Sequence, residues 1–215
     1  MNTWLLALKP ALVGLALIAW WFRRRRFGPR SFLLGAQLAI ATAVESRALF
    51  LSAHHIPNLW LYDLYVPAEF VLLLGYVAGR LPQRWQRSLV WPTLLLMAVA
   101  YGVDLKMRYP GGFVSGAFIC GSLVLVAALL VLLYDLALRV DRALVHQPLF
   151  WTFLGLVLFF SGMVPVLGLL NQLNDEDAGL MKTLFHANHV LFALRYGALV
   201  IACAIADPRS GNRTV

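Results

Sequence analysis

The chain has 215 residues, of which 61% are hydrophobic and only 13% are charged. Soluble domains carry about 25% charged residues, so this composition excludes an ordinary soluble protein and predicts a polytopic membrane protein. The formal net charge is +8, but the basic residues follow the apolar runs, a distribution that indicates membrane topology and no nucleic-acid partner.

Seven apolar runs of roughly 17 to 25 residues predict seven helices that cross the membrane. The predicted spans are Trp4–Phe22, Ser31–Ala53, Leu59–Leu81, Ser88–Val103, Phe113–Leu138, Pro148–Leu170 and Met181–Ala206. We therefore expect an all-α seven-helix bundle that forms one transmembrane domain over residues 1–207, with a short tail at 208–215. The short connections leave no room for a soluble catalytic domain.

The basic residues lie mostly on one side of the predicted bundle. That side carries Arg23–Arg26, Arg30, Arg80, Arg84, Arg87, Arg139, Arg142, Arg209 and Arg213. The other side carries Lys106, Arg108, Lys182 and the acidic run Asp175–Asp177. The positive-inside rule then predicts an outer N-terminus and a cytoplasmic C-terminus, with weak attraction of the basic side to anionic lipids. The first span has its arginines after the apolar run, so we expect an uncleaved anchor.

Ionisable residues deep within a span cost roughly 2.5–3.5 kcal/mol each on insertion scales, so each needs a partner, water or a function. Six qualify by their position in the predicted spans: Lys9, Glu45, Arg47, Asp63, Glu69 and Arg195. Three are basic and three are acidic, which predicts ion pairs inside the bundle. Lys9 is close enough to the outer surface that we expect its side chain to extend toward the headgroups.

The third span holds a polar stretch at 61–70, LYDLYVPAEF. One helical stripe carries Asn58, Tyr62, Tyr65 and Glu69, and Asp63 points about 100° away. Glu69 lies near the middle of the membrane. Pro67 removes the helical hydrogen bond to the carbonyl of Asp63.

The last span adds a second set of polar stripes. His189 and Tyr196 share one stripe, and Asn188 and Arg195 share its neighbour. Arg195 lies close to the depth of Glu69, and charge balance makes it the predicted partner. We expect the second, third and last spans to line one polar region that opens outward.

These stripes predict a pocket for a small amphiphile or a lipid. The predicted lining residues are Glu45, Arg47, Tyr62, Tyr65, Glu69, Asn188, His189 and Arg195. A sensory role would need a cytoplasmic or membrane partner protein. Two structural alternatives stay open: Glu69 and Arg195 could act only as an interhelical clamp, and the tyrosines could belong to an interfacial aromatic belt. A proton-coupled transporter that uses Glu69 is a further alternative.

Two resemblances bear on this reading. The pattern LYxxYxxxEF at 61–70, the run LFWTFLGLVLFFSG at 149–162 and the histidine-bearing last span resemble small seven-helix proteins of bacterial inner membranes. This resemblance implies the seven-helix fold and a location in the bacterial inner membrane.

The second resemblance is to the alkaline ceramidase and progestin/adipoQ receptor superfamily of seven-helix zinc hydrolases. It rests on Ser52, His54 and His55 late in the second span, Asp63 in the third, and the HANH run with His186 and His189 in the last. His186 and His189 are three residues apart, whereas the corresponding two histidines of the family are four residues apart. The resemblance implies zinc held by histidines from these positions. Asp63 and Ser52 would then be catalytic residues for hydrolysis of a lipid amide or ester.

Overall fold

The computed structural model describes residues 3–28, 30–81, 83–107, 115–139, 143–172 and 178–206. These residues form seven α-helices and two short 3-10 turns, and no strand occurs among them. The helices are α1 (Thr3–Arg23), α2 (Ser31–Ala53), α3 (Leu59–Ala78), α4 (Gln83–Met107), α5 (Ser115–Arg139), α6 (Pro148–Gln172) and α7 (Ala178–Ile205). The turns are η1 (Arg24–Arg26) and η2 (Leu144–His146).

The predicted helices are confirmed in number and order, and their ends differ by a few residues. The largest difference is α4, predicted over 88–103 and observed over Gln83–Met107. The apolar run marks only the part suited to lipid, whereas Gln, Arg and Lys at its ends are good helix formers and extend the helix. Helix α3 ends at Ala78, and the N–H of Gly79 still donates to the carbonyl of Gly75.

Five of the described helices are long and apolar enough to cross a membrane. These stretches are Ser31–Ala53, Leu59–Ala78, Gly116–Arg139, Pro148–Leu169 and Lys182–Ile205. This finding supports the prediction of a membrane protein with several spanning helices. The count of seven spans and their orientation stay predictions.

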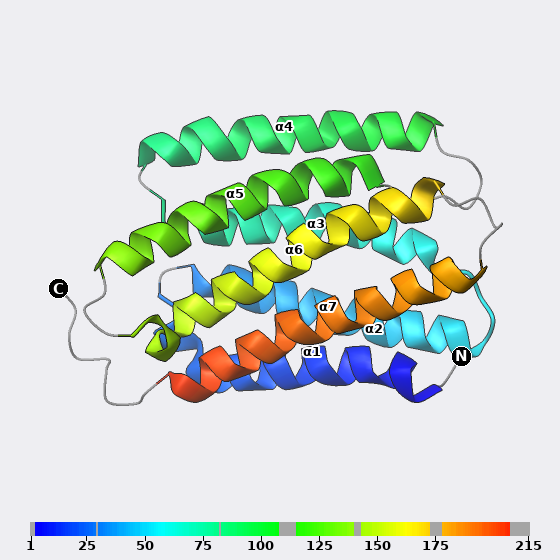
Figure 1. Cartoon of the computed structure of the whole chain (residues 1–215), viewed down its shortest axis with the longest axis horizontal. Coiled ribbons are helices and arrows are strands. Elements are labelled where there is room, and N and C mark those ends of the chain that lie inside the picture. Colours follow the sequence, from blue (N-terminus) through cyan, green and yellow to red (C-terminus); the bar gives the residue numbers. More distant parts are fainter. Residues whose placement is uncertain are drawn as a thin grey trace.

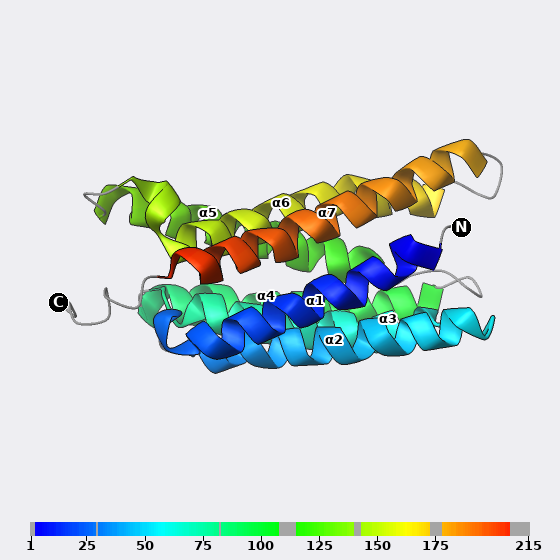
Figure 2. The same ribbon diagram turned by 90° about the horizontal axis from the view of Figure 1, so that it is seen from below.

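The helices form a closed ring in which each one packs against its neighbours in sequence and α7 returns to α1. Helices α1, α3, α5 and α7 begin at one end of the bundle, and α2, α4 and α6 begin at the other (Figure 1). Figure 2 shows two layers, with α5, α6 and α7 over α1, α2, α3 and α4. Residues late in α2 and early in α1, α3 and α7 therefore lie toward the same end.

The core on the side of α3, α5 and α6 is aromatic. The rings of Phe70, Phe118 and Phe160 have centroid separations of 5.3 to 5.8 Å. A Cβ atom on Gly121 of α5 would lie 2.9 Å from the Phe70 ring, so the glycine is what admits this close approach. The cluster fixes α3 in the bundle and thereby fixes the polar stripe on its other side.

The hydrogen bond that Pro67 removes from α3 is replaced from α4. The hydroxyl of Tyr101 donates to the backbone carbonyl of Asp63 at 3.3 Å. A second polar contact holds α4 at the same end, where the N–H of Ala117 donates to Asp104 Oδ2 at 3.0 Å and the acidic side chain caps the start of α5. The backbone defect predicted from the proline thus becomes a contact between two helices.

Candidate functional site

An ion pair between α3 and α7 lies at the centre of the polar region. Arg195 Nη2 is 2.6 Å from Glu69 Oε1, and the two side chains are 4% and 3% exposed. Two buried charges need each other because either one alone would carry a large desolvation cost. Arg195 is thus confirmed as the partner of Glu69.

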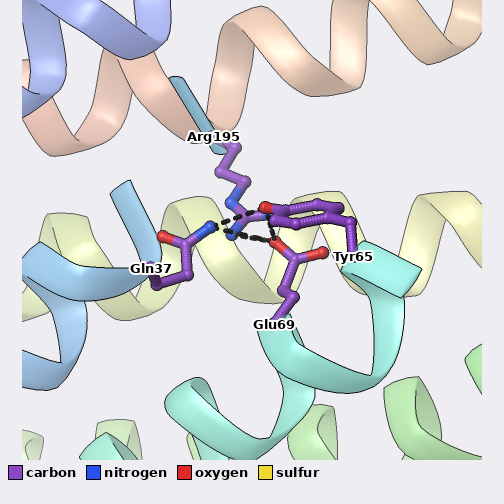
Figure 3. A network of polar contacts seen from close by, with 4 residues as sticks. All are labelled: Gln37, Tyr65, Glu69 and Arg195. Atoms are coloured by element: carbon purple, nitrogen blue, oxygen red, sulfur yellow. Dashed lines mark hydrogen bonds and ion pairs between the residues drawn. The ribbon is translucent and has the colours of Figure 1, made fainter. Parts of the chain in front are cut away.

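Two further side chains converge on the same carboxylate oxygen (Figure 3). Gln37 Nε2 donates to Glu69 Oε1 at 3.0 Å, and the Tyr65 hydroxyl donates to it at 2.8 Å. Gln37 Nε2 also lies 2.9 Å from the Tyr65 hydroxyl oxygen. We call Gln37, Tyr65, Glu69 and Arg195 the Glu69 network. It joins α2, α3 and α7, and it places three donors around one oxygen.

Aromatic rings surround the guanidinium group of Arg195. Its Cζ lies 4.7 Å from the ring centroid of Phe159, 5.2 Å from that of Phe160 and 5.0 Å from that of Tyr196. Such cation–π contacts are stronger when the cation is removed from water. Gly155 of α6 permits the close packing, since a Cβ there would lie 2.7 Å from Ala198 Cβ.

A second polar group lies closer than the Glu69 network to the end of the bundle at which α1 begins. The Tyr62 hydroxyl donates to Glu45 Oε2 at 3.3 Å, and Lys9 of α1 lies within electrostatic range of the buried Glu45 carboxylate. The Lys9 ammonium lies 5.2 Å from the ring centroid of Phe192. We call Lys9, Glu45 and Tyr62 the Glu45 group. Lys9 therefore faces the bundle, rather than extending to the headgroups as expected, because a carboxylate and a ring face attract it inward.

The two groups form one electrostatic unit. Glu45 interacts with Arg195 and Glu69 as well as with Lys9. Two acidic and two basic side chains therefore lie within electrostatic range of one another, and their formal charges sum to zero. It draws side chains from α1, α2, α3 and α7, whereas the sequence predicted contributions from three helices.

The predicted stripe on α3 faces α2 along its length. Asn58 Nδ2 donates to the carbonyl of Ala48 at 3.3 Å, and Tyr62, Tyr65 and Glu69 meet Glu45 or Gln37 farther along. Both tyrosine hydroxyls bond inside the bundle. This placement differs from an interfacial aromatic belt, in which the hydroxyls would face the headgroups.

Three other predicted lining residues lie apart from these hydrogen bonds. Arg47 is exposed, and its guanidinium lies 5.1 Å from the ring centroid of Phe50. Asn188 is half-buried. His189 is also half-buried, and its Nδ1 is 2.6 Å from the carbonyl of Phe185, so that nitrogen carries the hydrogen. Its Nε2 is buried without a hydrogen-bond partner in the described part of the chain.

The residues implied for zinc do not assemble. His54, His55 and His186 are exposed, and the Nδ1 atoms of His54 and His186 face carbonyls of their own helices at 2.9 and 2.7 Å. No group of three or more His, Cys, Asp or Glu side chains that could hold a metal occurs within the described ranges. Asp63 is buried on α3 and Ser52 is half-buried on α2. The residues present therefore do not fit the zinc site that the family resemblance implied.

Gln37 is the member of the network that the sequence reading missed. It is 1% exposed and donates to both Tyr65 and Glu69. Glutamine carries no charge, so the balance of ionisable residues in the sequence did not indicate it. A signal was nevertheless present, because Gln37 lies eight residues before Glu45 and helical residues eight apart lie on similar faces.

Two surface pockets, each of about 370 Å³, lie away from the Glu69 network. One follows α1 and is lined by residues Trp21 to Arg26. The other is an apolar groove between α6 and α7 that includes Trp151. Neither of these two pockets is lined by a residue of the Glu69 network or of the Glu45 group.

No protein-family model, curated protein or solved structure matches the chain.

Proposed function

We propose that the protein is an integral membrane protein that binds a small amphiphile between α1, α2, α3 and α7. The headgroup would meet the Glu45 group, and the Glu69 network would form the floor of the site. The observation that carries the proposal is the neutral unit of four ionisable side chains, Lys9, Glu45, Glu69 and Arg195, inside an apolar bundle.

The stability of the bundle alone does not require these charges. Each ionisable side chain deep in a span costs roughly 2.5–3.5 kcal/mol on insertion scales. Replacing a buried ion pair with well-packed apolar residues is often neutral or stabilising. A bundle that carries two acidic and two basic side chains between its helices therefore favours a functional site.

Burial within the unit indicates where a ligand would enter. Glu69, Arg195 and Gln37 are almost fully buried, whereas Lys9 and Tyr62 are half-buried. The half-buried side chains come from the early turns of α1 and α3, which lie at the same end of the bundle (Figure 1). A ligand arriving from that end would meet the Glu45 group first. By the positive-inside rule this end is the outer one.

The chemistry of the site favours a headgroup that both donates hydrogen bonds and tolerates neighbouring charges of either sign. Glu45 and the free Nε2 of His189 are acceptors, and Lys9 is a donor. An unpaired buried acceptor costs about 1–3 kcal/mol, so a ligand N–H or O–H donor would relieve this cost at His189. A hydrocarbon tail would lie along the apolar helix surfaces.

The test is to identify what the purified protein holds. Full-length protein in mild detergent is extracted with organic solvent, and the bound small molecules are quantified by mass spectrometry per mole of protein. Tyr62→Phe and Lys9→Gln change the Glu45 group, and Arg47→Gln changes an exposed basic residue as the matched control.

We expect the wild type and the Arg47→Gln variant to retain one amphiphile near equimolar amounts, and the other two variants to lose it at least about tenfold, as expected for about 1.4 kcal/mol. Equal retention in all four proteins would refute the site. A folded wild type with no amphiphile near stoichiometry would refute the function.

A further inference from the structure

Four consecutive arginines form a pocket where α1 ends. Arg23 is the last residue of α1, and Arg24–Arg26 form η1. The pocket measures about 370 Å³ and is lined by Trp21, Phe22 and these four arginines. No acidic side chain lines it, so four positive charges face one space. A basic cluster that directly follows an apolar helix is the pattern that attracts anionic lipid headgroups.

The fold holds this arginine turn in place. Phe27, the residue after η1, is fully buried in the core. Arg80, just after α3, donates to the carbonyl of Phe27 and also to the carbonyl of Tyr76 at 3.3 Å. The turn is thereby tied to α3 by side-chain and backbone contacts. A site that is already ordered loses less conformational entropy when it binds a ligand.

Two exposed aromatic side chains border the arginines. Trp21 is 56% exposed and Phe22 is 79% exposed. The guanidinium of Arg24 lies 4.2 Å from the ring centroid of Trp21. Tryptophan favours the boundary between hydrocarbon and headgroups. The pocket therefore combines a cationic surface with an apolar wall, at the position along α1 where a lipid headgroup would meet its acyl chains.

We propose that this pocket binds the phosphate group of an anionic membrane lipid. Arginine suits this role because its planar guanidinium forms paired hydrogen bonds to phosphate oxygens. Arg139, a basic residue at the same end of the bundle, lies outside this pocket and pairs with Asp135 at 2.8 Å. The proposal is independent of the amphiphile site between α1, α2, α3 and α7.

The test measures lipid adducts on the intact protein. Full-length protein in detergent is titrated with phosphatidylglycerol or with phosphatidylcholine of the same acyl chains, and the bound lipid is counted by native mass spectrometry. Arg24→Gln/Arg25→Gln is the test variant, and both residues are exposed, so folding does not depend on them. Arg139→Gln is the control with one exposed arginine removed. Thermal unfolding checks that every variant is folded.

We expect the wild type and Arg139→Gln to prefer phosphatidylglycerol. The double variant should bind it more weakly by about fivefold for each arginine removed. Equal binding by the double variant, or equal binding of the two lipids by the wild type, would overturn the proposal. Glycerol 3-phosphate and inorganic phosphate separate the sources of the phosphate. If these two compounds displace the lipid only at millimolar levels, the pocket is a lipid site. If either compound binds as tightly as phosphatidylglycerol, the pocket belongs to a soluble phosphate compound.

Discussion

The ion pair between Glu69 and Arg195 offers the sharpest test of the polar core. Glu69→Gln leaves the arginine charge buried without its counter-charge, and Arg195→Gln leaves the carboxylate with only the donors from Gln37 and Tyr65. Breaking a buried pair by removing one partner costs about 3–5 kcal/mol. We expect Glu69→Gln to be the more damaging change, because no other acidic side chain is bonded to Arg195 in the described part of the chain.

The assay is a double-mutant cycle on thermal unfolding in detergent. For a chain of this length about 1 kcal/mol corresponds to about 2–4 °C in the melting temperature, so each single variant should melt about 6–20 °C lower. The double variant should recover part of the loss, since it buries no unpaired charge. Arg47→Gln, exposed on α2, should stay within about 0.5 kcal/mol of the wild type. Strictly additive losses would refute the coupling.

Three further changes probe contacts around the site, each followed by thermal unfolding. Gln37→Leu deletes the two hydrogen bonds that Nε2 donates to Tyr65 and Glu69 and should lower the free energy of unfolding by about 1–3 kcal/mol. A neutral result would show that this glutamine only fills space. Tyr101→Phe should lower the free energy of unfolding of the wild type by about 1 kcal/mol. The loss should be smaller in a Pro67→Ala background, because the restored N–H of residue 67 can donate to the same carbonyl of Asp63. An equal loss in both backgrounds would contradict this account. Gly155→Ala should lower the free energy of unfolding by about 1–3 kcal/mol, because the added Cβ would meet Ala198 of α7. Gly168→Ala is the control, since a Cβ there meets nothing within 4 Å and should not lower stability. Equal melting temperatures of the two variants would refute the close contact between α6 and α7.

Much of the polar core follows from helical spacing and charge balance. The stripe that includes Tyr62, Tyr65 and Glu69 does face another helix, and Arg195 is the partner of Glu69. These predictions held because a helix presents residues three, four and seven apart on one face, and because a buried charge requires an opposite charge.

The misplaced residues share a different cause. Arg47 was assigned to the pocket from its depth, yet it lies on an exposed face, and Lys9 was expected at the headgroups, yet it lies beside Phe192 and Glu45. The depth of a residue along a helix can be predicted from the sequence. Whether its side chain faces the bundle interior or the outside depends on how that helix is rotated about its axis against its neighbours. The histidines of α2 and α7 likewise matched a family in order, while their side chains do not gather.

The sequence by itself determined the helices, because apolar length and local backbone hydrogen bonding are properties of contiguous residues. It also determined which charges could balance, because composition sets the available partners. Only the tertiary structure decided that α7 returns to α1, that Gln37 joins the Glu69 network, and that Lys9 completes a neutral unit. Those outcomes depend on the rotation and neighbours of each helix, which are set by packing between residues far apart in the chain.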